Sequence, residues 1–284
     1  MRKSILYSLA VLASPALAAA SPAIASTSAP LPAQASSCAE CATGVSAVLS
    51  HPRRADDQAR DVFRHPAETL AFFAVKPGMT VVDYMPSGGW YTRVLVPYLG
   101  EKGRYIGLNP NPGENPQFAA YAGGLAEKFP PAAAKWDLQG APIAAFNTDG
   151  LPKEMTGTVD RVLVFRSMHT LVRNGVAESE LKAMHQLLKA DGLLGIAQHR
   201  AREDAPDAYV DGSKGYLRQK DVIALVEQHG FELVGTSEIN ANPKDTADHP
   251  AGVWELAPDL RTKREELKPV GESDRMTLLF RKRP

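Results

Sequence analysis

Several polar side chains directly follow predicted strands, where they could act on a bound ligand. Asp83 ends the first predicted strand, and His169 and His199 follow two later ones. Histidine titrates near neutral pH and transfers protons, and two histidines close together could also begin a metal site. A histidine at a strand end can equally bond only to a neighbouring loop. Because carboxyl ends of parallel strands share one edge of a sheet, we expect His169 and His199 to lie in one crevice and act in acid–base catalysis.

The segment of residues 80–92 combines a buried strand, a glycine turn and the start of a helix. Gly88 and Gly89 allow the backbone to approach a ligand closely, and the free N–H groups of the new helix face the same crevice. This arrangement is typical of the opening of a nucleotide-binding α/β domain. Met85 and Ser87 occupy positions at which the usual form of this loop has glycine.

The amino terminus has the pattern of a secretory signal peptide. Arg2 and Lys3 precede a short apolar run, which is followed by the small-residue sites Ala16–Ala18 and Ala23–Ala25. The run is too short for a membrane span. We expect general secretion with cleavage after Ala25, which would make the protein periplasmic or secreted; an uncleaved anchor is the alternative.

Residues 26–49 form a Ser/Ala/Pro-rich segment, which predicts a disordered tether before a domain of residues 50–284. The tether contains the only two cysteines, Cys38 and Cys41. In an oxidising compartment this spacing favours a local disulfide, and two cysteines alone make a poor zinc site.

The composition excludes some partners. Lys plus Arg and Asp plus Glu balance at 32 each in the 284 residues, and no basic run stands out, so nucleic acid is not an expected partner. After signal cleavage nothing predicts membrane association, and a small-molecule ligand is the expected partner.

The body of the chain alternates predicted strands and helices, which predicts an α/β fold with a doubly wound, mostly parallel sheet. An amphipathic helix is expected over residues 177–190, ended by Asp191 and Gly192. Two short helices are expected between His51 and Val75. The last two strands are expected to form an antiparallel pair.

Two polar segments flank this core. The charged run of residues 53–66 leads onto the expected ligand edge, so Arg64 or Asp57 could line the site, although an exposed charged helix is the usual explanation. The excursion of residues 240–275 is long enough to be a lid rather than a simple insertion. We expect lid or substrate contacts from Tyr216, Asn242, His249 and Trp254, and a catalytic contribution from Glu272 and Asp274.

These features together resemble the class I S-adenosylmethionine-dependent methyltransferases, and more narrowly the exported "predicted methyltransferase" group of proteobacteria. The resemblance spans residues 50–284 and implies a seven-stranded, Rossmann-like methyltransferase sheet. The motifs that carry it are the turn after the first strand, residues 53–66, Lys76–Met79, Ser167–His169, Leu187–Leu193, Gly230–Phe231, residues 240–245 and the closing strand pair.

The resemblance also implies S-adenosylmethionine as the cofactor. Asp83, Ser87, Gly88 and Gly89 would border its methionine end, Asn109 its ribose and Asp149 its adenine. The chain departs from the family at Met85 and Ser87, where glycine is usual, and at Asn109, where a carboxylate is usual. An amide accepts with only one oxygen, and each such lost contact costs about 1–3 kcal/mol.

Three functions remain open from the sequence. The first is methyl transfer to a small molecule, with His169 or His199 deprotonating the acceptor. The second is metal-dependent or acid–base chemistry on the same fold without S-adenosylmethionine, using these histidines with Glu272 or Asp274. The third is a periplasmic binding protein without catalytic activity.

Overall fold

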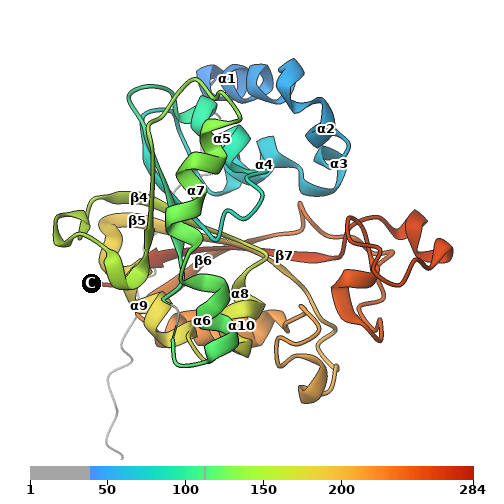
Figure 1. The fold of residues 1–284 in the computed structure, drawn as a ribbon. Coiled ribbons are helices and arrows are strands. Elements are labelled where there is room, and N and C mark those ends of the chain that lie inside the picture. Colours follow the sequence, from blue (N-terminus) through green and yellow to red (C-terminus); the bar gives the residue numbers. More distant parts are fainter. Residues whose placement is uncertain (1–38, 112) are drawn as a thin grey trace, which may run out of the picture. The chain divides into compact units, whose positions relative to one another are not determined.

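A seven-stranded sheet organises the part of the chain that this computed structural model describes, residues 39–111 and 113–284 (Figure 1). The strand order is β3-β2-β1-β4-β5-β7-β6. The first five strands are parallel, and β7 runs antiparallel between β5 and β6, as predicted. The strands are β1 (Thr80–Tyr84), β2 (Arg104–Asn109), β3 (Ile143–Asn147), β4 (Val159–Phe165), β5 (Leu188–His199), β6 (Phe231–Ser237) and β7 (Arg275–Lys282).

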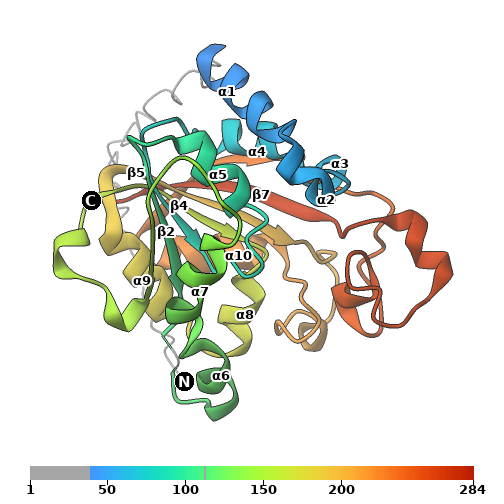
Figure 2. The same ribbon diagram turned by 45° about the horizontal axis from the view of Figure 1, so that its top comes forward.

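Two helical layers bury the two faces of the sheet, because alternate side chains of each strand point to opposite sides. Val82 and Tyr84 of β1 pack in one apolar cluster, whereas Val81 packs in the other. Figure 2 shows α1, α4 and α5 on one side of the strands and α8 and α9 on the other. The α-helices after the first strand are α5 (Thr92–Leu99), α6 (Pro116–Ala122), α7 (Leu125–Ala134), α8 (Met168–Arg173), α9 (Ala177–Leu187) and α10 (Gln219–Gln228), with the 3-10 turns η2 (Thr148–Gly150), η3 (Lys153–Met155) and η4 (Asp207–Tyr209).

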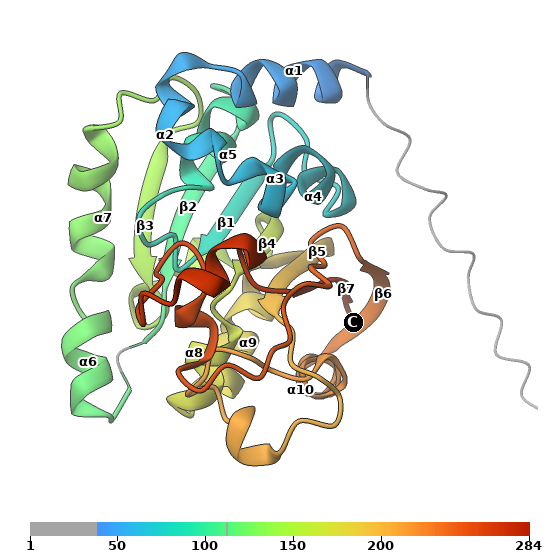
Figure 3. The ribbon, with the colours of Figure 1, turned by 90° about the vertical axis from the view of Figure 1, so that its right-hand side faces the viewer.

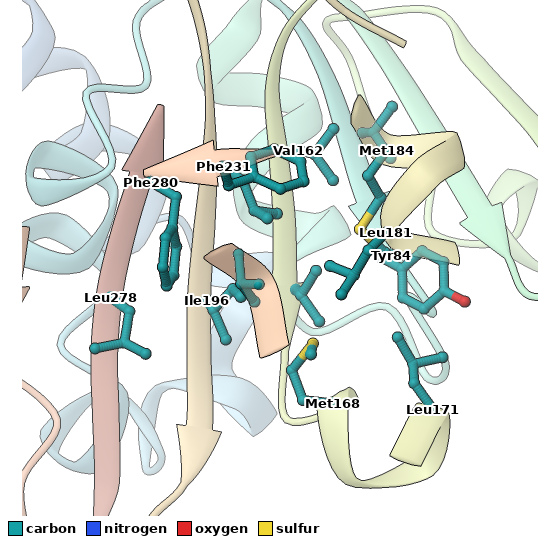
Figure 4. Packing of buried hydrophobic residues seen from close by; sticks show 14 of the residues in the cluster. Tyr84, Val162, Met168, Leu171, Leu181, Met184, Ile196, Phe231, Leu278 and Phe280 are labelled. Carbon is teal, nitrogen blue, oxygen red and sulfur yellow. The ribbon is translucent and has the colours of Figure 1, made fainter. Parts of the chain in front are cut away.

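The layer of α8, α9 and α10 is held by large apolar side chains that are fully buried (Figure 4). Met168 and Leu171 of α8, and Leu181 and Met184 of α9, pack onto the sheet, each with no measurable exposure. Full burial of such a side chain contributes about 1.5–3 kcal/mol. This packing fixes the start of α8, which places His169 at the carboxyl edge of the sheet.

The other layer begins earlier in the chain than the sequence predicts. Residues 39–49 were expected in a disordered tether, but they form α1 (Ala39–Leu49), whose Val45 is buried in the cluster with α5. The tether prediction is therefore wrong for these residues, because α1 buries part of its surface against the domain. The side chains of residues 38–43 and the whole signal segment lie outside the described residues, so the predictions for Cys38 and Cys41 stay untested.

The charged lead-in contains more helical pieces than the two expected. They are η1 (Pro52–Arg54), α2 (Ala55–Gln58), α3 (Asp61–Arg64) and α4 (Pro66–Phe72). His65 has a left-handed backbone (φ 39°) that separates α3 from α4. Arg54 and Arg64 are fully buried, so this segment is not the exposed charged helix that its composition usually indicates.

The helix expected over residues 177–190 ends at Leu187, because Leu188 is extended and already belongs to β5. Leu188 pairs with Val159 of β4, and a register shift follows before Leu193 pairs with Arg161. The predicted turn at Asp191 and Gly192 therefore lies within the irregular beginning of a long strand.

The expected lid folds over the carboxyl ends of the strands (Figure 3). It contains the 3-10 turns η5 (Gly252–Glu255) and η6 (Glu265–Val270), so it is less irregular than its sequence suggests. Buried Asp245 fastens it: its carboxylate accepts hydrogen bonds from the Tyr216 hydroxyl at 2.9 Å and from the backbone N–H of Asp274 at 2.8 Å, and lies 3.0 Å from His249 Nε2. In the described part of the chain, no helix is both long and apolar enough to cross a membrane.

The turn after β1 has room for glycine alone at one position. Gly89 has a left-handed backbone (φ 73°), and a Cβ built there would lie 2.0 Å from the indole of Trp136. At neighbouring Gly88 an added Cβ would meet nothing within 4 Å. Gly89 therefore serves close packing between the turn and Trp136.

This difference predicts that two matched substitutions will change the free energy of unfolding by unequal amounts. Gly89→Ala should lower the free energy of unfolding by about 2–4 kcal/mol, because it adds a clash and backbone strain. Gly88→Ala, the control, should change it by less than about 1 kcal/mol. Urea denaturation followed by circular dichroism measures both, and equal effects would contradict the packing role of Gly89.

Candidate functional site

A cavity of about 320 Å³ opens at the carboxyl ends of β1, β4 and β5, beneath the segment of residues 253–259. This volume is at the lower end of that typical for small-molecule sites. The side chains and turns that line it are those of Asp57, Arg60, Asp83, Met85, Pro86, Ser87, Gly88, Trp90, Tyr91, Arg93, Phe165, Arg166, Ser167, His169, His199, Val253, Trp254, Ala257, Pro258, Asp259, Glu272 and Ser273.

The turn that borders the cavity keeps a glycine-type backbone without glycine. Met85 (φ 53°) and Ser87 (φ 50°) both lie in the left-handed region. The Ser87 hydroxyl donates a hydrogen bond to the Met85 carbonyl at 3.2 Å, which supports this conformation. Residues held in such regions cost about 1–3 kcal/mol each and persist where the surrounding structure requires them. The turn thus has a left-handed backbone at two positions where the sequence suggested that glycine is usual.

Asp83 is a buried carboxyl group at the floor of the cavity. The Tyr105 hydroxyl donates to its Oδ2 at 2.8 Å and lies 2.8 Å from the Thr92 hydroxyl. Burial raises the pKa of Asp83 to about 7, although the Tyr105 hydrogen bond and the charge of Arg166 act in the opposite direction. A carboxyl group with a pKa near the working pH can both accept and donate a proton.

His169 and His199 do meet in one crevice, with ring centroids 5.7 Å apart. Both line the cavity and both are neutral near pH 7. Burial lowers the pKa of His169 to about 4. Burial, and then the neighbouring His169, Arg166 and Arg275, lower the pKa of His199 well below its usual value.

The hydrogen bonds of the two rings indicate which nitrogen carries the proton. The Gln198 amide donates to the Gly215 carbonyl at 2.7 Å, which orients its nitrogen toward His169 Nδ1 at 3.4 Å. His199 Nδ1 lies 2.5 Å from the Ser273 hydroxyl, which has no other partner among the described residues. An amide nitrogen only donates, so His169 Nδ1 accepts and its proton lies on Nε2. A Ser273 hydroxyl that donates to His199 Nδ1 leaves the His199 proton on Nε2 as well. Each ring can then present an N–H group to a ligand, and the proton transfer predicted for these histidines stays a prediction.

Glu272 is the centre of a group of arginine side chains beside the cavity. Its carboxylate accepts hydrogen bonds from Arg60 Nε at 2.6 Å, Arg64 Nε at 3.1 Å and Arg275 Nη1 at 3.0 Å. Burial alone would raise the pKa of Glu272, but these guanidinium groups and Arg166 outweigh it and lower the pKa to about 2. Glu272 is thus a fixed anion, which does not suit the proton transfer predicted for it.

Asp57 connects the lead-in to the glycine turn. Arg93 makes two hydrogen bonds to the Asp57 carboxylate, at 2.6 and 2.7 Å, and a third to the Gly88 carbonyl at 2.8 Å. Trp90 Nε1 donates to the Asp57 carbonyl at 3.2 Å. Of the lead-in residues, Asp57 lines the cavity, which the sequence had suggested, and Arg60 lines it without having been predicted.

Arg166 is another residue that sequence analysis missed. It follows β4 directly, has a left-handed backbone (φ 57°) and lines the cavity. Burial and the nearby arginines lower its pKa to about 9, so it remains a cation near pH 7. Its sequence signal is an arginine at a strand end, between Phe165 and Ser167, which is weak without the structure.

Several predicted residues lie away from the cavity. Asn109 is buried (3% exposed) and Asp149 is exposed, and neither lines the cavity. Asp274 pairs with Arg200 at 2.8 Å outside it. Four further residues have structural contacts: Arg64 lies behind Glu272, Asn242 donates to the Glu272 carbonyl at 2.6 Å, and Tyr216 and His249 bond to Asp245. Of the predicted lid residues, Trp254 lines the cavity.

The described residues include no cluster of three or more His, Cys, Asp or Glu side chains arranged to hold a metal ion. The hydrogen-bond partners of His199 and His169 are Ser273 and Gln198, respectively, and neither is an acidic, cysteine or histidine metal ligand.

Comparison with solved structures places the fold. A chain of the Haloferax volcanii complex between the Trm112 methyltransferase activator and its methyltransferase matches 84% of this chain and 97% of its own length, at 14% identity and a TM-score of 0.50. The cyclase SpnF matches over 82% of this chain and 86% of its own, at 15% identity and a TM-score of 0.52. A SAM-dependent methyltransferase from Aquifex aeolicus matches 69% of this chain and 93% of its own, at 22% identity and a TM-score of 0.47.

No family model matches the chain, and no curated protein matches it. The strand order, the closing antiparallel pair and the two matches with a TM-score of 0.50 or more define a Rossmann-like fold, similar to that of solved methyltransferases. Neighbours at this identity establish the fold and leave the chemistry to the site.

The site fits S-adenosylmethionine in part only. Asp83, Ser87 and Gly88 line the cavity where the methionine end would lie. Asn109, at the ribose position, is buried, and its Nδ2 has no hydrogen-bond partner among the described residues. Gly89 packs against Trp136. The residues that would hold the adenosine therefore do not line this cavity, and the fit rests on the methionine end alone.

The pKa of Asp83 predicts a pH-dependent gain for Asp83→Asn, which keeps an acceptor for the Tyr105 hydroxyl. Between pH 4 and 7 the folded wild type holds a proton that the unfolded chain has released, so its stability falls as pH rises and stays low above pH 7. A shift from 3.8 to about 7 is roughly three pKa units, so D83N should gain about 4 kcal/mol of unfolding free energy over wild type between pH 4 and 8. Urea denaturation across this range measures it; a constant difference would contradict the raised pKa.

Proposed function

We propose that this protein has the methyltransferase fold but binds a small molecule at the β1–β4–β5 cavity without S-adenosylmethionine, and transfers protons on that molecule. Methyl transfer with the cofactor is the second candidate. It is supported by the fold and by Asp83, Ser87 and Gly88 at the cavity.

The observation that carries the proposal is the set of hydrogen bonds between the segments that follow β2 and β3. The backbone N–H of Asn111 donates to the Thr148 hydroxyl at 2.7 Å and to buried Glu180 at 3.0 Å. The Asn147 amide donates to the carbonyls of Pro110 and Ala122, at 2.8 and 3.1 Å. These bonds join the segments that follow β2 and β3, at which ribose and adenine would bind, and fasten them to α6 and α9.

Charge supports the same conclusion. S-adenosylmethionine carries a sulfonium and an ammonium group against one carboxylate, so its net charge is positive. Arg166 lines the cavity with Arg60, while Arg64 and Arg275 contact Glu272. Like charges in a partly buried site repel strongly because little water screens them. This arrangement favours a ligand of the opposite charge.

The proton-transfer groups are complementary in role. Asp83, with its pKa raised to about 7 by burial, is the group that can accept a proton from a bound molecule. His169 and His199 carry N–H groups that would stabilise negative charge as it develops. The proton acceptor thus lies at the end of β1, and the N–H donors lie at the ends of β4 and β5.

Calorimetric titration of residues 26–284 with S-adenosylmethionine and S-adenosylhomocysteine tests the proposal. We expect no binding up to millimolar ligand, whereas a cofactor-binding methyltransferase of this fold, run in parallel, should bind. Micromolar affinity would overturn the proposal and favour the second candidate.

The variant Asn109→Asp separates space from chemistry in this titration. It supplies the carboxylate usual at the ribose position, but at a buried site. We expect no gain in cofactor binding and a loss of stability, since an unpaired buried charge is costly. Binding by N109D would mean that the amide, and not closure, prevents cofactor binding.

Export from the cytoplasm remains part of this proposal. S-adenosylmethionine is made in the cytosol, and a chain exported unfolded cannot carry it, so a cofactor-independent site suits a periplasmic or secreted protein. The basic start, short apolar run and small-residue sites support export.

Expression of the full chain in a Gram-negative host should yield a protein in the periplasmic fraction that begins at Ser26. Amino-terminal sequencing and intact mass measure this. Retention in the cytoplasm with Met1 intact would contradict the assignment.

A further inference from the structure

Arg166 stands out among the charged groups of the cavity floor because it lacks a partner. Asp57 pairs with Arg93, Arg60 with Glu272, and Asp83 accepts from a tyrosine. The Arg166 guanidinium makes no hydrogen bond or ion pair to any described residue, and its Nε is buried without a partner. Charges with little solvent exposure are normally paired in folded proteins, so a partly buried cation without a partner at a cavity indicates a missing counter-ion.

The neighbouring charges make this lack of a partner more costly. Arg60, Arg64 and Arg275 share the single carboxylate of Glu272, and none of its oxygens bonds to Arg166. The two terminal nitrogens of Arg64 are also buried without partners in the described residues. Four guanidinium groups therefore face Glu272 and Asp83, and Asp83 is half protonated near pH 7 because burial raises its pKa. Asp259 also lines the cavity but is exposed and makes no ion pair to a described residue. Around Glu272 itself, guanidinium groups outnumber carboxylates.

The backbone conformation of Arg166 is a second indication of a ligand site. Its left-handed conformation (φ 57°) is unfavourable for a long side chain, and a 2.7 Å hydrogen bond from its N–H to the Ala197 carbonyl holds it. Strain of this kind persists where surrounding structure enforces it and is frequent at ligand sites. The strained residue is also the unpaired one, although the two observations are independent.

Two neutral N–H donors accompany this cation at the same cavity. His169 and His199 accept at Nδ1 from Gln198 and Ser273, which leaves their Nε2 protons for a ligand. A guanidinium group gives two parallel N–H bonds to a planar or tetrahedral oxyanion, and neutral imidazole adds further donors.

We infer that the cavity recognises a small ligand through an oxyanion group, carboxylate or phosphate, that binds Arg166 with the N–H groups of His169 and His199 beside it. This inference names the substrate class for the proposed function and rests on that function using the same cavity. A volume of about 320 Å³ restricts the ligand to a small metabolite-sized anion.

Arg166→Gln tests the inference, with Arg281→Gln as the matched control. Arg281 lies on β7, pairs with Glu232 at 2.8 Å and is half exposed outside the cavity. Melting temperatures are measured with inorganic phosphate, malonate and acetate, and with sodium chloride at equal ionic strength. Calorimetry then gives affinities for anions that stabilise the wild type.

At least one of phosphate, malonate and acetate should raise the melting temperature of wild type and R281Q beyond the chloride control. R166Q should lose this response, with an affinity at least tenfold weaker, and Arg166→Lys should retain part of it. A response to phosphate alone, or to the carboxylates alone, identifies the oxyanion. Without ligand, R166Q should melt above wild type, because it removes an unpaired buried charge.

An equal anion response in wild type and R166Q would overturn the inference, as would no response of wild type to any of the three anions. If R166Q does not fold, the Arg166→Lys variant decides. An anion response of R166K as strong as that of wild type, accompanied by an equal response to chloride, would also contradict an oxyanion site. Failure of the proposed function can be distinguished from failure of this inference. If S-adenosylhomocysteine binds and R166Q abolishes that binding, the cofactor-independent function fails while the oxyanion role of Arg166 holds.

Discussion

The contact on which the site depends is the buried carboxylate of Glu272 among guanidinium groups. Arg60 and Arg64 come from the charged lead-in and Glu272 from the end of the lid, more than two hundred residues later. Removing one partner of such a buried cluster leaves a charge without compensation, which costs about 3–5 kcal/mol. The cluster therefore holds lead-in and lid together over the strand ends, and it sets the positive potential of the cavity.

The turn after β1 shows how a backbone conformation can be kept while the residues that usually adopt it are replaced. Met85 and Ser87 retain left-handed backbones that glycine normally supplies, so the strand still delivers Asp83 to the carboxyl edge. At the neighbouring strand, however, Asn109 is buried and the loops of β2 and β3 bond to one another. The end of β1 thus borders the cavity, whereas Asn109 at the end of β2 does not.

Burial decides what each titratable group can do. It raises the pKa of Asp83 to about 7 and lowers that of His169 to about 4, which exchanges the roles that their unperturbed values suggest. The carboxyl group becomes the one that titrates near neutrality, and the imidazoles become neutral donors. Glu272 stays ionised because four arginines outweigh its own desolvation. Such divergence of neighbouring pKa values is typical of functional sites.

The sequence by itself determined the sheet, its antiparallel closing pair and the edge at which Asp83, His169 and His199 meet. Strand periodicity and turn chemistry are local, so they can be recognised in one dimension. The tertiary structure alone decided that Arg166 lacks a partner, that Asn109 is buried and that Tyr216 and His249 are structural. Pairing and burial depend on contacts between segments far apart in the chain, as between Arg64 and Glu272, and no local pattern encodes them.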